Sequence, residues 1–104
     1  MKAYVISEVE VLDEEAADDY RQLAASSIAE HGGSYLVRGA RAEVAEGEPT
    51  KRRVVIVEFP SLGRAREWYS SPAYAEALRF RERALKRRVT FVEGVAPEGA
   101  TDAR

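Results

Sequence analysis

The sequence predicts a single α+β domain in which two helices cover one face of a four-stranded antiparallel sheet. The chain has 104 residues, 45% of them hydrophobic, which is enough for one buried core. It contains no cysteine, so that core is built without a disulfide. Apolar residues follow strand and helix periods in the order strand, helix, strand, strand, helix, strand.

The first strand and the first helix occupy the N-terminal third. Residues 3–9 are rich in β-formers, and Asp13 is placed to cap a following helix. Apolar residues then recur every three or four positions from Ala16 to His31. Gly32 and Gly33 should end the helix, because glycine accepts the left-handed conformation of a C-terminal cap.

Two strands and a hairpin loop follow. The second strand is predicted at residues 34–38, and Gly39 marks a bulge or bend before a looser extension. A charged loop over residues 45–51 leads to the third strand, residues 52–59. That strand carries apolar side chains on both faces, so both faces need cover.

The second helix is predicted to be broken. Ser61 caps its first piece, and Ser71 with Pro72 restarts it, since proline is tolerated at the first helical position. The restarted helix is predicted to continue through Leu85, and the fourth strand to cover residues 88–95.

These six elements predict a ferredoxin-like βαββαβ domain over residues 1–95. Residues 96–104 mix proline, glycine, alanine and charges without periodicity, and we expect a disordered tail. Two helices cover only one side of the sheet, whereas the third strand is apolar on both. A second copy of the chain is the simplest cover for the open face, which predicts a homodimer.

Composition excludes several classes of function. Sixteen basic against eighteen acidic residues give a net charge of -2, with no global attraction to nucleic acid or anionic membrane. No signal peptide or bilayer-spanning run is present, so we expect a cytoplasmic protein. One histidine and no cysteine argue against a metal site, and the absence of phosphate-loop and dinucleotide motifs predicts no cofactor.

One local basic run is a candidate RNA surface. The aliphatic third strand lacks the stacking aromatics that RNA-recognition domains of this topology need. The run is therefore interpreted as a solvated helix face. Its members are Arg79, Arg81, Arg83, Lys86, Arg87 and Arg88.

His31 is a candidate for proton transfer. It is the only histidine, with an ordinary pKa near neutrality, and it ends the buried stripe of the first helix. The alternative is that it interacts with the helix dipole and the last carbonyls.

Arg38, Arg53 and Arg81 interrupt apolar patterns, so each guanidinium needs a partner. Glu58 and Glu93 at strand ends could supply structural ion pairs. The functional alternative is that these arginines hold a substrate carboxylate or enolate.

Four aromatic residues should gather where the first helix meets the broken second helix: Tyr20, Trp68, Tyr69 and Tyr74. Such residues commonly form core. They could also form a wall for a planar ligand, and the Tyr20 phenol could act as a general acid.

A set of short motifs resembles a known family. The set comprises Ala3-Tyr4-Val5-Ile6, Gly32-Gly33, Leu36-Val37-Arg38-Gly39, Glu58-Phe59-Pro60-Ser61, Trp68-Tyr69, Ser71-Pro72-x-Tyr74 and Val92-Glu93-Gly94-Val95. In order and spacing they resemble the domain-of-unknown-function family numbered thirteen-thirty, within the dimeric α/β-barrel superfamily. The resemblance covers residues 3–95. It implies a homodimeric ferredoxin-like fold with a pocket between sheet and helices in each subunit.

The superfamily includes cofactor-independent monooxygenases, muconolactone-type isomerases, haem-degrading enzymes and stress-response dimers, so fold alone assigns no reaction. We expect a protein that binds a planar anionic or aromatic metabolite, with isomerase, cyclase or monooxygenase-like chemistry. His31 and Tyr20 would transfer protons. Arg38, Arg53 and Arg81, with Trp68, Tyr69 and Tyr74, would bind the ligand. The alternative is a non-catalytic dimeric binding or stress-associated protein.

Overall fold

The computed structural model describes residues 1–96. Its elements in chain order are β1 (Ala3–Val11), α1 (Glu14–Glu30), β2 (Ser34–Arg41), β3 (Arg53–Phe59), α2 (Leu62–Tyr69), α3 (Pro72–Ala84) and β4 (Leu85–Glu93). This order confirms the predicted βαββαβ class and the break in the second helix. The expected disorder of residues 96–104 falls, beyond Ala96, outside the described residues.

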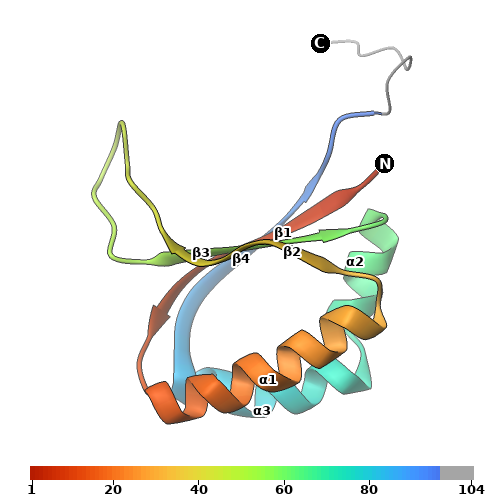
Figure 1. Ribbon diagram of the computed structural model, residues 1–104, viewed down its shortest axis with the longest axis horizontal. Helices are drawn as coiled ribbons and strands as arrows, with labels where there is room; N and C mark the ends of the chain where they lie inside the picture. Colours follow the sequence, from red (N-terminus) through yellow and green to blue (C-terminus); the bar gives the residue numbers. More distant parts are fainter. Residues whose placement is uncertain (97–104) are drawn as a thin grey trace.

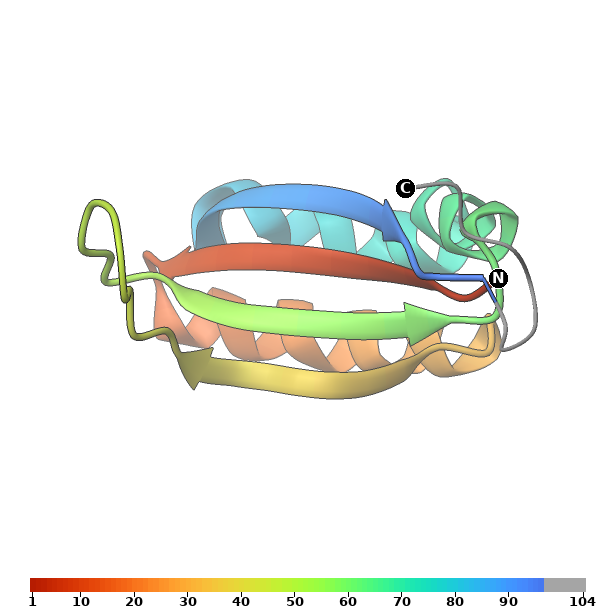
Figure 2. The same ribbon diagram turned by 90° about the horizontal axis from the view of Figure 1, so that it is seen from above.

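The four strands form one antiparallel sheet in the order β2-β3-β1-β4, which is the ferredoxin-like arrangement. Figure 1 shows α1 and α3 side by side beneath the sheet. Seen from above, the opposite face of the sheet carries no helix formed by the described residues (Figure 2). The helix layer and the open face are therefore as predicted.

Polar side chains begin each helix, as the sequence predicts. The hydrogen bonds run from Ala16 N to Asp13 Oδ1, from Arg64 N to Ser61 Oγ and from Tyr74 N to Ser71 Oγ, each 3.1 Å long. α1 ends at Glu30, and Gly32 has a φ of 78°, which glycine adopts without a Cβ clash.

The boundary between α3 and β4 differs from the prediction. Leu85 is the first residue of β4 rather than part of the helix, and the strand begins three residues before Arg88. The backbone carbonyl of Ala84 accepts hydrogen bonds from Leu12 N at 2.7 Å and Asp13 N at 3.3 Å. These bonds fix the chain where β1 ends, so Leu85 pairs with Val11 instead of continuing the helix.

The core lies between the sheet and the helices. Phe59, Trp68 and Tyr74 are buried, and the rings of Trp68 and Tyr74 lie 4.2 Å apart between centroids. The predicted gathering of aromatic residues is confirmed. On the open face of the sheet, Tyr4, Ile6 and Ile56 remain partly exposed. No helix among residues 1–96 is long and apolar enough to cross a bilayer.

Candidate functional site

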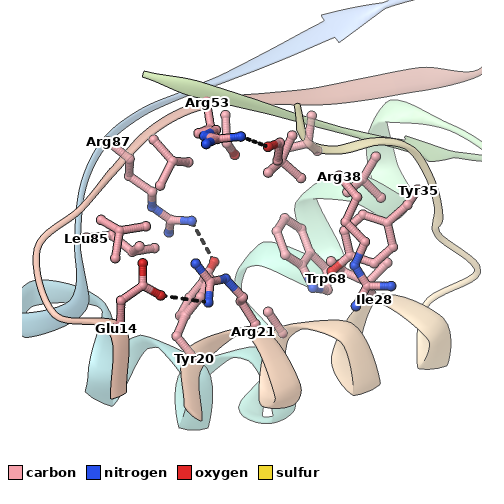
Figure 3. Close-up of a pocket in the computed structure, with 18 residues that line it drawn as sticks. Glu14, Tyr20, Arg21, Ile28, Tyr35, Arg38, Arg53, Trp68, Leu85 and Arg87 are labelled. Carbon is pink, nitrogen blue, oxygen red and sulfur yellow. Dashed lines mark hydrogen bonds and ion pairs between the residues drawn. The ribbon is translucent and has the colours of Figure 1, made fainter. Parts of the chain in front are cut away.

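A cavity of about 500 Å³ lies between α1 and the helix-facing side of the sheet (Figure 3). Valines of β1 and β3 form its apolar wall: Val5, Val9, Val55 and Val57. These side chains share one face because alternate residues of a strand point the same way. Ser7, between Val5 and Val9 on the same face, adds one hydroxyl to this wall.

Within the part of the chain that the structure describes, four arginines line the cavity: Arg21, Arg38, Arg53 and Arg87. Figure 3 shows Arg87 toward one end, Arg38 toward the other and Arg53 against the sheet. Among residues 1–96, Glu14 is the only acidic residue that lines it, and its Oε2 lies 3.6 Å from Arg21 Nη1. The charged groups around the cavity are therefore net positive.

Arg38 reaches the cavity because β2 is irregular. The pairing of β2 with β3 shifts between Tyr35 and Val37 and again between Arg38 and Ala40. Gly39, at the second shift, has a φ of 83°, which confirms the predicted bulge. As a result Tyr35 and Arg38 face the same side, and the Arg38 guanidinium carbon lies 4.2 Å from the centroid of the Tyr35 ring. Burial raises the pKa of the Tyr35 phenol, against the lowering effect of Arg38.

Arg53 and Arg81 are placed differently. Arg53 lines the cavity, and its Nη1 donates to the Gly39 carbonyl at 3.4 Å. Arg81 is exposed on α3 and does not line the cavity. Within the described residues neither arginine, nor Arg38, pairs with Glu58 or Glu93, and Glu58 instead accepts from Lys2 Nζ at 3.2 Å.

Arg87, Tyr20 and Tyr74 form a hydrogen-bonded group, which we call the Arg–Tyr–Tyr triad. Arg87 Nη1 donates to Tyr20 Oη at 2.6 Å, and Nη2 donates to Tyr74 Oη at 2.7 Å. The two phenol oxygens lie 2.5 Å apart. The buried Nε of Arg87 has no hydrogen-bond partner among the described residues. Tyr20 lines the cavity, whereas Tyr74 lies behind it and is fully buried.

Burial keeps Tyr20 protonated, and the two tyrosines help keep Arg87 charged. Burial raises the pKa of the Tyr20 phenol, Tyr74 adds to this effect, and the opposing effect of Arg87 is smaller. Burial by itself would lower the pKa of Arg87, but the two tyrosines outweigh it and raise that pKa. At neutral pH the cavity is therefore bordered by a guanidinium cation and by a phenol that can donate a hydrogen bond.

The remaining predicted site residues fall into two groups. Trp68 lines the cavity, and its indole N–H donates to Ser27 Oγ at 3.0 Å. His31 and Tyr69 do not line it. His31 Nδ1 lies 2.8 Å from the Ser27 carbonyl oxygen at the end of α1, so the ring contacts the helix terminus. A catalytic role for His31 stays a prediction.

Arg87 belongs to the run interpreted from the sequence as a solvated helix face, and it was not predicted as a site residue. Its signal was the alternation Leu85, Arg87, Val89, Phe91, which puts all four side chains on the helix-facing side of β4. The helical period assigned through Leu85 concealed that alternation. Among residues 1–96, no group of three or more His, Asp or Glu side chains could hold a metal ion.

The sheet order, the two-helix layer and the internal cavity define a ferredoxin-like α+β protein with a pocket between sheet and helices. Residues 2–95 match the family described as "Domain of unknown function (DUF1330)", and the chain belongs to that family. No curated protein matches the chain in sequence.

Solved structures share this fold. A protein of unknown function from Rhodopseudomonas palustris is 21% identical, with a TM-score of 0.73 over 92% of this chain and 84% of that chain. SnoaB, a cofactor-independent oxygenase from Streptomyces nogalater, is 11% identical, with a TM-score of 0.61 over 95% and 98%. A dimeric protein of unknown function and ferredoxin-like fold from Bacteroides fragilis is 13% identical, with a TM-score of 0.60 over 89% and 96%. At these identities the likeness shows the fold alone.

Proposed function

We propose that this protein is a homodimer in which each subunit binds a small, planar, anionic organic molecule in the cavity between the sheet and α1. The observation that carries the proposal is the charge around an apolar cavity. Arg38, Arg53 and Arg87 reach it from three strands, and within the described residues none of the three forms an ion pair. An anionic ligand would supply the missing negative charge.

The shape of the cavity favours a flat ligand. Valine side chains form one wall, and the rings of Tyr35 and Trp68 stand at the end where Arg38 lies (Figure 3). A volume of about 500 Å³ is in the range of small-molecule sites. A cavity filled by the protein's own side chains would have favoured a purely structural protein instead.

The homodimer rests on the open face of the sheet. Tyr4, Ile6, Val54 and Ile56 lie on this face in its two central strands, β1 and β3, and Figure 2 shows no helix of residues 1–96 over these strands. Val92 of β4 extends the same face and is 40% exposed. Glu8 and Glu58 lie on the same face, opposite Val54 and Tyr4. Burying the apolar side chains between them against a second copy would remove apolar surface from water. A relative of the same fold from Bacteroides fragilis is dimeric.

Chemistry on the ligand, where it occurs, would be cofactor-independent and of the isomerase, cyclase or monooxygenase-like kind. The Tyr20 hydroxyl beside the Arg87 cation is the group in the cavity best suited to stabilise an enolate-like oxygen. SnoaB, which shares the fold, is a cofactor-independent oxygenase.

Trp68 makes the binding test direct, since it is the only tryptophan and it lines the cavity. We would titrate the protein with anthraquinone-2-carboxylate and follow quenching of tryptophan fluorescence, with uncharged anthraquinone as the matched ligand. We expect saturable quenching by the carboxylate at lower concentration than by the neutral compound. Arg38→Gln and Arg53→Gln should each weaken binding of the carboxylate by about tenfold or more, because each removes a hydrogen bond between two charged groups.

The control variant is Arg79→Gln, an exposed arginine of α3 that pairs with Glu76 away from the cavity. It should bind as the wild type does. Equal affinity for the carboxylate and the neutral compound, or equal losses in the cavity and control variants, would overturn the anionic-ligand proposal. In that case the alternative, a non-catalytic dimeric or stress-associated protein, would be the better description.

A further inference from the structure

We infer that the Arg–Tyr–Tyr triad fixes the Tyr20 hydroxyl as a one-way hydrogen-bond donor into the cavity, which selects ligands carrying a carbonyl, enolate or phenolate oxygen there. Tyr20 is then a specificity-determining residue, and Tyr74 and Arg87 are its positioning residues. This inference rests on the proposed function and adds the ligand group that lies against Tyr20.

The donors and acceptors of the triad fix the direction of each of its hydrogen bonds. Arg87 can only donate, and it donates to both phenol oxygens, so neither phenol can direct its hydrogen at the guanidinium. Two hydroxyl hydrogens remain, while a single contact joins the two phenol oxygens. One phenol therefore donates its hydrogen to the other, and the hydroxyl hydrogen of the second phenol has no acceptor within the triad.

Burial decides which phenol has the free hydrogen. Tyr74 is 0% exposed, and among the described residues its oxygen has no partners other than Arg87 and Tyr20. If Tyr20 donated to Tyr74, the Tyr74 hydrogen would be buried without an acceptor, which is costly. If Tyr74 donates to Tyr20, the Tyr20 hydrogen faces the cavity, where water or a ligand can accept it.

The same geometry excludes the opposite role for Tyr20. Its oxygen already accepts from Arg87 and from Tyr74, which uses both of its lone pairs. A ligand N–H or O–H group would find no acceptor there. The site therefore discriminates by direction: an oxygen acceptor is bound at Tyr20, and a donor group of the same size is not.

The first test needs no ligand. A neutron structure of the perdeuterated wild-type protein locates both hydroxyl deuterons. We expect the Tyr74 deuteron to lie between the two phenol oxygens and the Tyr20 deuteron to point into the cavity. A Tyr20 deuteron lying between the two oxygens would overturn the inference, whatever the protein is found to bind.

The second test uses matched probes. The four positional isomers of 9-fluorenone carboxylate carry a ring carbonyl, and the corresponding fluorene carboxylates carry a methylene group in its place. Titrations followed by Trp68 fluorescence give the preference for ketone over methylene in the tightest-binding isomer. We expect a preference of about five- to tenfold in the wild type and none in Tyr20→Phe. Tyr4→Phe, on the open face of the sheet, should keep the full preference.

The outcomes separate the two proposals. Binding of neither probe series would overturn the proposed anionic-ligand function, and the neutron result would still decide the direction of the Tyr20 hydroxyl. Binding of both series without a ketone preference, or with a preference that survives in Tyr20→Phe, would overturn the inference and leave the proposed function standing.

Discussion

The indole N–H of Trp68 donates a hydrogen bond to Ser27 Oγ across 3.0 Å, and this bond joins α2 to α1 beside the cavity. The Ser27 hydroxyl in turn donates to the Ala24 carbonyl at 2.8 Å, so its hydrogen is satisfied. Ser27 is fully buried, which makes it a polar link inside an apolar core. The contact holds the aromatic wall of the cavity in place.

Ser27→Ala should lower the free energy of unfolding by about 1–3 kcal/mol, because it leaves the buried indole N–H without an acceptor. Urea denaturation followed by circular dichroism would measure the change. The neighbouring Ser26 is exposed on the same helix, and Ser26→Ala should change stability by no more than about 0.5 kcal/mol. Equal effects of the two substitutions would contradict a structural role for the Trp68 contact.

Two glycines should respond to alanine with opposite signs. A Cβ on Gly33 would lie 2.6 Å from Ile28 Cγ2 and 2.9 Å from Phe59 Cε1, both in the core, so Gly33→Ala should destabilise by about 1–3 kcal/mol. Gly63 lies in α2, and the nearest atom to an added Cβ there is Ser61 Oγ at 3.8 Å. Gly63→Ala should stabilise by up to about 1 kcal/mol. The midpoints of thermal unfolding would show whether the signs differ.

The raised pKa of Tyr20 predicts a loss of stability in alkali. Above pH of about 10 the phenol ionises in the unfolded chain but stays protonated in the folded protein, so rising pH favours unfolding. Above that pH, ionisation of Tyr20 in the unfolded chain should lower the free energy of unfolding by about 1.4 kcal/mol per pH unit. Below that pH the contribution is fully present. Denaturant titrations between pH 9 and pH 11 should give a steeper fall for the wild type than for Tyr20→Phe, and parallel curves would contradict the prediction.

The proposed homodimer predicts a specific response to charge on the open face of the sheet. Ile56 pairs with Ile6 near the middle of that face, and Ile56→Glu would place an uncompensated carboxylate in the interface. Light scattering should give the wild type twice the chain mass of 11.6 kDa and the variant the mass of one chain. Ala75→Glu, exposed on α3, should remain dimeric. A wild-type protein that is monomeric at micromolar concentration would rule out the homodimer.

Local rules explain why the fold was predictable. Each helix is capped by a side chain that accepts a hydrogen bond from a backbone N–H three residues further along the chain; the capping residues are Asp13, Ser61 and Ser71. The bulge in β2 coincides with the positive φ of Gly39. Signals of this range can be read directly from neighbouring residues. The four predicted aromatic residues also met, because each lies on the apolar stripe of its helix.

The triad was harder to predict because its members come from three distant segments. Tyr20 and Tyr74 are 54 residues apart, and Arg87 lies on a strand whose first residues had been assigned to a helix. The residue at which α3 ends determines which arginines of the basic run face the cavity. α3 ends where the Ala84 carbonyl accepts hydrogen bonds from Leu12 N and Asp13 N. These residues are far from Ala84 in the sequence, so no local pattern predicts the end of the helix.

The register shifts in β2 make the charge of the cavity depend on how β2 pairs with β3 as well as on residue identity. β2 is an edge strand, so a residue can be gained or lost there without unpairing a neighbour on its outer side. If β2 kept regular pairing after Tyr35, Val37 would lie opposite Val55 and Arg38 would turn to the open face, although every side chain is kept. A comparison of residue types alone would overlook this dependence on register.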